Sequence, residues 1–252
     1  MLAKVPHKIN LGLHVMEKLS SGFHALETIF YPCNNYEDTI EILPASQFSF
    51  TIENADFQCE IAQNLCVKAY RLLQGIYHLP PVHIKLTKQI PSGSGLGGGS
   101  ANAAFTLQIL NQLFSLQIST NQLHEYATRL GSDTAFFLYN TPMYATGRGE
   151  ILTSVDLNLT EYKIEIVCPN ISISTAQAYS NITPKKPKTS LIQAIKHPVK
   201  QWKEILMNDF EEVIFNQYPQ LLEIKNNFYR KGALYAAMSG SGSALFGIFE
   251  KV

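Results

Sequence analysis

Alternating polar and apolar residues predict a series of β-strands in the first third of the chain. The strand candidates are residues 7–15, 25–33, 38–43 and 49–52. Apolar residues then recur at helical spacing over residues 64–76, and residues 82–87 again alternate as in a strand. A long helical pattern follows over residues 101–116. The chain therefore begins as a mixture of strands and helices.

Residues 119–122 match a capping box, in which a serine and a glutamine satisfy the free amides at the start of a helix. This helix is expected to end at Gly131, because glycine commonly follows the last turn. Ser132 or Asp133 is expected to cap a short helix that runs through residues 136–137.

Residues 143–152 contain two glycines and are interpreted as a bent hairpin. The second half of the chain adds strands at residues 163–167 and 244–249, and helices at residues 174–179, 202–214 and 220–229. Antiparallel strands and helices that occur in blocks are typical of an α+β fold. We expect two lobes with a cleft between them.

The composition favours an ordinary globular protein. The chain has 252 residues, of which 46% are hydrophobic and 16% charged, and its formal net charge is +0. This length supports a substantial core, and the neutral charge gives no sign of a nucleic-acid partner. Residues 184–188 are rich in lysine and proline, and we interpret them as a solvated loop.

Four cysteines, Cys33, Cys59, Cys66 and Cys168, form no C-x-x-C pair, so we expect no zinc or redox motif. They are interpreted as buried or incidental thiols in a reducing compartment. No apolar run of about 18 residues and no signal-peptide core occurs. We therefore expect a cytoplasmic protein without a membrane partner.

The most distinctive chemistry lies in a glycine-rich stretch at residues 91–101, which read Pro-Ser-Gly-Ser-Gly-Leu-Gly-Gly-Gly-Ser-Ala. Glycine is costly to order, so its concentration implies that the backbone must approach something closely. Backbone amides of such a loop can surround anionic oxygens. The stretch is expected at the N-terminus of the following helix, where the helix dipole favours phosphate.

Other glycine-rich loops fit less well. A Walker A loop needs a lysine after the glycines, and none is present. A dinucleotide fingerprint needs an acidic residue about 20 positions on, whereas the first acid after the loop is Glu125. The H-R-D and D-F-G motifs of protein kinases do not occur. A flexible linker is also disfavoured, because a strand and a helix bracket the stretch closely.

The stretch resembles the ATP loop of the GHMP kinase superfamily, and this resemblance implies a loop that wraps the ATP phosphates. The residues that it would contribute are Pro91, Ser92, Gly93, Ser94, Gly95, Leu96, Gly97, Gly98, Gly99, Ser100, Ala101 and Asn102. Ser100 and Asn102 would lie near the phosphates or a magnesium ion. Asn64 and Lys88 are weaker candidates on the nucleotide side.

The resemblance also implies the two-lobed GHMP kinase fold. Its N-terminal lobe resembles domain 2 of ribosomal protein S5, and its C-terminal lobe is ferredoxin-like. We place the N-terminal lobe, with the ATP loop and the catalytic pair, at residues 1–155 and the C-terminal lobe at residues 156–252. Relatives commonly continue past the last strand by a helix and a strand. Two explanations are open for the shorter length here: a trimmed second lobe, or a sequence that stops before the natural end of the protein.

Phosphoryl transfer needs positioned phosphates and a group that orients or deprotonates the attacking hydroxyl. Asp133 and Lys8 are candidates, although an aspartate after glycine is more often a helix cap and a lysine that opens a strand is more often a solvated charge. The family resemblance implies that these two residues form the catalytic pair. This resemblance extends over nearly the whole chain. Within the superfamily, the chain is most similar to the branch that phosphorylates the 2-hydroxyl of 4-diphosphocytidyl-2-C-methyl-D-erythritol in the non-mevalonate isoprenoid pathway.

In that branch a Gly-Tyr-His motif binds the cytosine, and the corresponding residues here are Gly22, Phe23 and His24. Phenylalanine keeps a stacking face but lacks the hydroxyl. The other substrate-binding residues that the resemblance implies are Asn10, Thr175, Tyr179, Ser239 and Gly240. Period two along the strand is expected to place Asn10 on the same face as Lys8.

Two other readings remain open at this stage. The chain could be another GHMP enzyme, such as a mevalonate-type kinase or the related diphosphate decarboxylase, or a sensor of the same fold that binds ATP without catalysis. The short distance from Lys8 to the motif at residues 22–24 argues against the first, and intact Lys8 and Asp133 argue against the second. For either kinase we expect ATP and Mg²⁺ and a monomer or weak homodimer. Because no acidic residue lies within the glycine loop, we expect phosphate oxygens, water and Ser100 to supply most of the ligands of the metal.

Overall fold

The computed structural model describes residues 1–55, 60–180, 182–187 and 189–251, without the side chain of Thr175. Its contacts divide the chain into two compact units. The first consists of Met1–His7, Cys33–Ser92 and Gly97–Asn140, and the second of Lys8–Pro32, Gly93–Leu96 and Thr141–Val252. Each unit is described by itself below.

The two longest strands, β1 (Leu2–Lys18) and β2 (His24–Pro44), pair with each other and contribute residues to both units. The predicted break between residues 33 and 38 is wrong, because β2 runs through it without interruption. The polar residues 34–37 continue the strand as an exposed or half-buried stretch rather than as a turn.

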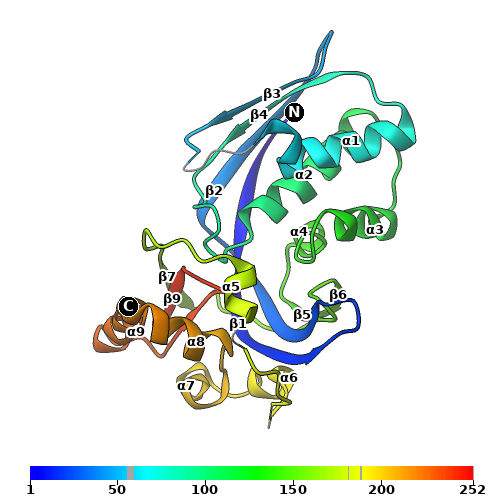
Figure 1. The fold of residues 1–252 in the computed structure, drawn as a ribbon. Coiled ribbons are helices and arrows are strands. Elements are labelled where there is room, and N and C mark those ends of the chain that lie inside the picture. The colour runs from blue at the N-terminus through cyan, green and yellow to red at the C-terminus, as the bar shows by residue number, and fades with distance from the viewer. Residues whose placement is uncertain (56–59, 181, 188, 252) are drawn as a thin grey trace. The chain divides into compact units, whose positions relative to one another are not determined.

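In the first unit, β4 (Val82–Thr87) lies between β3 (Ser49–Glu53), to which it is parallel, and residues 39–44 of β2, to which it is antiparallel. The alternation in β4 buries Val82, Ile84 and Leu86. Helices α1 (Leu65–Tyr77) and α2 (Gly98–Leu113) pack against each other, as Figure 1 shows. The 3-10 turn η1 (Ile61–Gln63) precedes α1.

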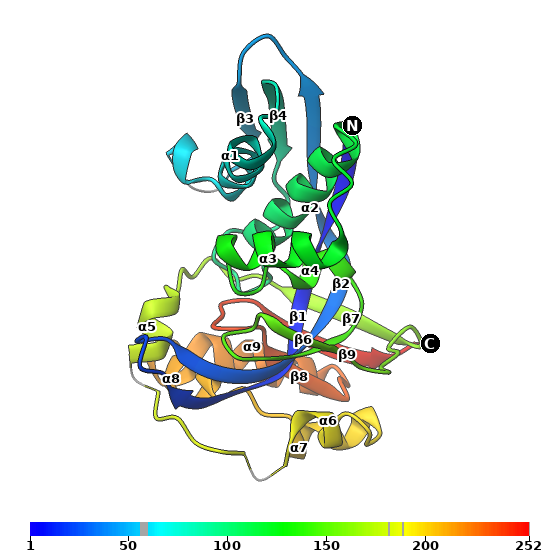
Figure 2. The same cartoon turned by 90° about the vertical axis from the view of Figure 1, so that its right-hand side faces the viewer.

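Helix α2 also contacts α3 (Thr120–Leu130) and α4 (Phe136–Tyr139), whose neighbouring positions are visible in Figure 2. The capping box of α3 is confirmed, since Ser119 and Gln122 exchange their hydrogen bonds. The prediction that Ser132 or Asp133 caps α4 is wrong: the N-cap is Ala135, which already has helical angles and no side-chain cap. Residues 132–135 form a turn instead.

In the second unit, the predicted hairpin is confirmed as β5 (Met143–Thr146) and β6 (Ile151–Ser154), and β5 pairs with residues 28–30 of β2. A second antiparallel sheet has the order β7 (Tyr162–Val167), β9 (Leu245–Glu250), β8 (Tyr235–Met238). The helices of this unit are α5 (Thr175–Ser180), α6 (Leu191–Ala194), η2 (Val199–Gln201), α7 (Trp202–Ile205), α8 (Phe210–Gln217) and α9 (Pro219–Arg230).

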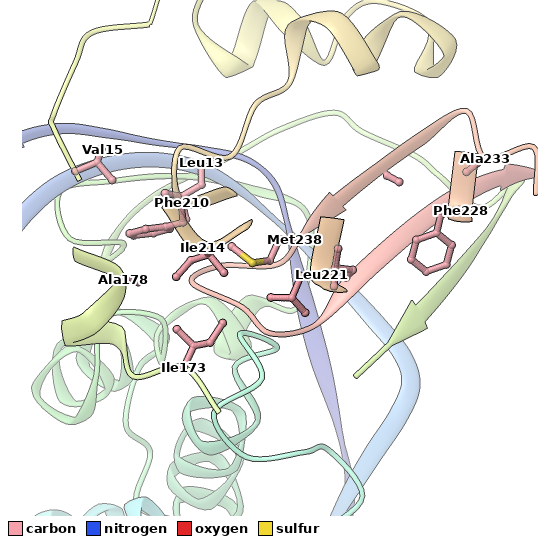
Figure 3. Packing of buried hydrophobic residues seen from close by; sticks show 12 residues of the cluster. Leu13, Val15, Ile173, Ala178, Phe210, Ile214, Leu221, Phe228, Ala233 and Met238 are labelled. Carbon is pink, nitrogen blue, oxygen red and sulfur yellow. The ribbon is translucent and has the colours of Figure 1, made fainter. Parts of the chain in front are cut away.

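A hydrophobic core joins α8 and α9 to the second sheet and to β1 (Figure 3). Phe210 and Ile214 come from α8, and Leu221 and Phe228 from α9. They pack in one cluster with β1 and sheet residues that include Leu13, Val15, Met238 and Leu245. Burial of these side chains removes apolar surface from water and fixes the helices on the sheet. Among the described helices, none is both long and apolar enough to cross a bilayer.

The predicted helix over residues 202–214 is wrong in its middle, because residues 206–209 separate α7 from α8. Asn208 is buried there, and its amide donates to the carbonyls of Met238 and Gly240 at 2.8 and 2.9 Å. Its Oδ1 accepts from the amide of Phe210 at 3.0 Å. These bonds compete with the helical ladder, and nothing in the helical spacing reveals them.

Replacement of Asn208 with alanine is expected to lower the free energy of unfolding by at least about 2 kcal/mol, because buried polar groups left unsatisfied cost about 1–3 kcal/mol each. Chemical denaturation measures this. The matched control is Asn226→Ala on the exposed side of α9, which should change stability little. Equal, small effects of both substitutions would contradict this account of the break.

Candidate functional site

The glycine stretch leads directly into α2, as its sequence predicts. The helix begins at Gly98, three residues before the predicted start, and ends at Leu113. Gly97 is the N-cap with left-handed angles, and no side chain caps the first amides. Gly93 and Gly95 also have positive φ. The backbone therefore leaves the first helical amides available to an anion, as at phosphate-binding helix ends.

The middle of the loop, Gly93–Leu96, packs within the second unit against residues 239–244. The amide of Ala244 donates to the carbonyl of Ser94 at 3.0 Å. At Gly95, φ is +80°, and a Cβ would lie 2.1 Å from the carbonyl oxygen of Ser239. Only glycine allows this approach, so the conformation of the loop and the position of the 239–242 turn depend on each other.

Lys8 lies on β1 in contact with this part of the loop. Its ammonium donates to the Oδ1 of Asn10 and, at 2.9 Å, to the carbonyl of Gly95, and its backbone amide donates to the carbonyl of Leu96 at 3.0 Å. Lys8 is only 2% exposed, so its interpretation as a solvated charge at the start of a strand is wrong. Burial of an ammonium requires such oxygen acceptors. The strand period does place Asn10 beside Lys8, as expected.

Ser239 completes this cluster. It is fully buried, and its hydroxyl lies 3.3 Å from the Oδ1 of Asn10 and 3.0 Å from the carbonyl of Gly95. Gly240 is adjacent: a Cβ on it would lie 3.3 Å from the carbonyl of Gly95. The second unit thus brings together Lys8 and Asn10 of β1, the loop backbone and the 239–240 turn, which come from three distant stretches of sequence.

The first unit holds the two ends of the loop through a carboxylate that sequence reasoning missed. Asp38, on β2, is fully buried and accepts from the ammonium of Lys88 and from the amide of Asn102 at 2.8 Å. It also accepts from the backbone amides of Gln89 and Ile90 at 2.7 and 2.8 Å. This ties the segment before the loop to the first turns of α2. The one available signal was a charge at an inward position of a predicted strand.

These contacts give Lys88 and Asn102 a positioning role in the unit, and a direct contact of either with nucleotide stays a prediction. Asn64 likewise has a local role, because it is the N-cap of α1 and accepts from the amide of Cys66 at 2.9 Å. The expected contacts of Asn64, Pro91, Ser92 and Ala101 with nucleotide also stay predictions.

Asp133 lies in the turn before α4, half-buried, within the first unit. This turn approaches the start of α2. A Cβ on Gly131 would lie 2.9 Å from the hydroxyl of Thr134 and 3.7 Å from that of Ser100. The predicted base and the predicted phosphate-binding serine are therefore carried by neighbouring segments of one unit, which close packing at Gly131 permits.

Aromatic residues from the predicted cytosine motif lie in the second unit. The ring of His24 stacks on Tyr179 with centroids 4.8 Å apart and an angle of 16°, and Tyr179 meets Phe210 edge-on at 4.9 Å. Phe23 is 55% exposed, with the guanidinium of Arg148 5.1 Å from its ring centre. His24 and Tyr179 are thus brought together, while the side chain of Thr175 lies outside the described part of the structure.

Other catalytic chemistries find less support. Burial raises the pKa of the Cys33 thiol to about 12 and that of Cys66 to about 11, so neither is a thiolate nucleophile near neutral pH. Cys59 lies outside the described residues. Within the described ranges, no group of three or more histidine, cysteine or acidic side chains could hold a metal ion.

Comparison with known proteins decides the family. Residues 64–141 match the GHMP kinases N terminal domain and residues 191–251 the GHMP kinases C terminal domain. A 4-diphosphocytidyl-2-C-methyl-D-erythritol kinase of Bacteroides thetaiotaomicron is 49% identical over 247 residues, which cover 96% of this chain and 90% of the relative. The chain belongs to the GHMP kinase family. A relative with the same name from Bacteroides fragilis is 50% identical over the same length.

Solved structures agree with this GHMP kinase assignment. The crystal structure of a 4-(cytidine 5'-diphospho)-2C-methyl-D-erythritol kinase superposes with a TM-score of 0.80 at 30% identity, over 98% of this chain and 90% of that one. A homoserine kinase from Cytophaga hutchinsonii has a TM-score of 0.73 at 18% identity, over 99% and 85%, and shows the fold alone. The predicted GHMP kinase fold with mixed helices and sheets is confirmed.

The packing of the loop makes a direct prediction for two glycines of this GHMP kinase. Both Gly93 and Gly95 have positive φ, but space around Gly93 is open, whereas a Cβ on Gly95 meets the Ser239 carbonyl. Gly93→Ala is expected to cost only the left-handed strain, about 1–2 kcal/mol. Gly95→Ala should cost at least about 1 kcal/mol more, because overpacking is added. Denaturant unfolding compares the two, and indistinguishable midpoints would argue against the packing described.

Proposed function

We propose that this GHMP kinase transfers the γ-phosphoryl group of ATP to the 2-hydroxyl of 4-diphosphocytidyl-2-C-methyl-D-erythritol, a step in isoprenoid precursor synthesis. The observation that carries the proposal is the Lys8 ammonium, buried and hydrogen-bonded to the backbone of the glycine loop. Relatives that bear this enzyme's name are about half identical over nearly the whole chain. The acceptor is therefore the one that these relatives are named for.

In the proposed reaction, the glycine loop and the uncapped amides of α2 bind the triphosphate. Asp133 takes the proton of the acceptor hydroxyl, whose oxygen attacks the γ-phosphorus while ADP leaves. Lys8 stabilises the carboxylate and the developing negative charge.

The proposed site offers magnesium one protein oxygen, the hydroxyl of Ser100, in addition to the phosphate oxygens and water. Mg²⁺ prefers oxygen ligands and retains several waters. The hydroxyl of Ser100, in the first turn of α2, is the protein group that would bind it beside the phosphates. When bound, the ion would neutralise charge on the triphosphate.

The cytidine moiety would be recognised by the aromatic cluster around His24. Tyr179 and Phe23 offer ring faces to the base, and His24 offers ring nitrogens for hydrogen bonds. Because Phe23 carries no hydroxyl, this contact consists of stacking alone. In the structure, His24 and Tyr179 stack on each other. This stack must open or shift before a base can pack against the ring faces that now meet.

Asp133→Asn is expected to retain ATP binding and lose about 10²–10⁴-fold in kcat, because the amide cannot accept the proton. Steady-state kinetics with 4-diphosphocytidyl-2-C-methyl-D-erythritol, together with nucleotide titration, measure both quantities. Asp156→Asn, at an exposed position, is the matched control and should keep normal turnover. Near-normal kcat in the Asp133 variant would refute its role as the base.

The same assay decides the substrate when the wild-type protein is given mevalonate, homoserine and galactose beside the cytidylyl compound. Turnover of the cytidylyl compound alone supports the proposal. Turnover of mevalonate would instead indicate a mevalonate-type kinase. ATP binding without turnover on any substrate would indicate a sensor.

His24→Ala is expected to raise KM for the cytidylyl substrate about 2- to 10-fold, which corresponds to the loss of an aromatic contact of about 0.5–1.5 kcal/mol. KM for ATP should stay nearly unchanged. His197→Ala, at an exposed position of the same unit, controls for general effects of losing an imidazole. Equal damage to both KM values would mean that His24 has a structural role only.

A further inference from the structure

Thr28, on β2, links two residues of β1 inside the second unit. It is fully buried, and its Oγ1 lies 2.6 Å from the carbonyl oxygen of Gly12 and 2.9 Å from the Nδ2 of Asn10. A carbonyl oxygen can only accept a hydrogen bond, so the single hydroxyl hydrogen of Thr28 is committed to Gly12. Towards Asn10, the Thr28 oxygen can then only accept.

This direction decides how the amide of Asn10 is turned. The two ends of an asparagine amide have nearly the same shape, and their partners determine which end points where. With the NH₂ group at Thr28, the Oδ1 faces the ammonium of Lys8 and the hydroxyl of Ser239. In the opposite orientation, an NH₂ donor would face the Lys8 ammonium, and that arrangement is repulsive.

The hydrogen bonds therefore all donate in one direction: Lys8 donates to Asn10, Asn10 to Thr28, and Thr28 to the Gly12 carbonyl. The Lys8 ammonium donates both to the Oδ1 of Asn10 and to the carbonyl of Gly95. The Ser239 hydroxyl lies within reach of the same two oxygens, and its single hydrogen can serve one of them at a time. The Oδ1 of Asn10 faces Lys8 only while Thr28 accepts a hydrogen bond from the NH₂ group at the other end of the Asn10 amide. Gly12, Thr28, Asn10 and Lys8 are all buried, so water offers no easy substitute partner within this chain of hydrogen bonds.

We propose that Thr28 is a positioning residue that orients Asn10 and thereby holds the Lys8 ammonium in its catalytic place. This role rests on the proposed function, because Lys8 is catalytic only there. The effect comes from the hydroxyl and not from the size of the side chain. Valine has the same shape without the hydroxyl, and serine keeps the hydroxyl without the methyl group, so the pair separates the two contributions.

The experiment compares Thr28→Val with Thr28→Ser in the full-length enzyme. Thr28→Val is expected to lower kcat about tenfold or more, while KM for ATP stays within about threefold of the wild-type value. A tenfold fall in kcat corresponds to a small loss of transition-state stabilisation, as expected when the Lys8 ammonium is slightly misplaced. Thr28→Ser should restore kcat to within about threefold of wild type. A normal kcat in the valine variant, or equal losses in both variants, would overturn the proposal.

A second readout does not depend on turnover. In protein labelled with ¹⁵N-asparagine, the side-chain amide hydrogens of Asn10 should exchange with solvent slowly in the wild type and in Thr28→Ser, and faster in Thr28→Val. The exposed Asn226 serves as the internal reference. Exchange of Asn10 as fast as that of Asn226 in the wild-type protein would contradict the proposal, even if the valine variant does not fold.

The two readouts also separate this proposal from the proposed function. If the wild-type protein phosphorylates no cytidylyl substrate, the function is wrong, and the Asn10 exchange rates still decide whether Thr28 orients the amide. If the wild-type protein is active and the Thr28 variants behave alike in both readouts, the function stands and the positioning role fails.

Discussion

Burial of two ammonium groups is the constraint on which the rest of the structure depends. Lys8 is 2% and Lys88 6% exposed, and a buried cation is tolerated only where oxygen atoms replace its lost water. In the first unit the Asp38 carboxylate supplies the oxygen acceptor for Lys88. The other hydrogen bonds of Asp38 fix Gln89, Ile90 and Asn102. In the second unit the Oδ1 of Asn10 and a loop carbonyl are among the acceptors of Lys8.

Both solutions act on the glycine loop, which explains why that stretch is so well defined. Asp38 holds the backbone before the loop and the helix after it, while Lys8 and Ser239 bind the carbonyl of Gly95 in its middle. A loop rich in glycine has much conformational freedom to lose. The structure offsets this cost with bonds to buried charged groups, which are stronger than bonds between neutral partners. The amides of α2 are thereby arranged before any phosphate binds.

The fold by itself does not choose the substrate. A homoserine kinase and mevalonate kinases share the architecture at 12–18% identity. The side chains that we propose to bind the cytidylyl group are the stacked His24 and Tyr179 and the exposed ring of Phe23. Phe23 directly precedes β2, His24 is the first residue of that strand, and Tyr179 lies on the short helix α5.

Local sequence was enough to predict the order of most strands and helices, the glycine loop before α2, the capping box at Ser119 and the family, because these depend on neighbouring residues and on local spacing. Tertiary structure alone decided the continuous β2, the break at Asn208, the burial of Lys8 and the part of Asp38. Asn208 stops a helix because two carbonyls 30 and 32 positions away accept its amide. Asp38 matters because Lys88 and Asn102 reach it across 50 and 64 positions. Such partners are brought together only by folding, so no local pattern reveals them.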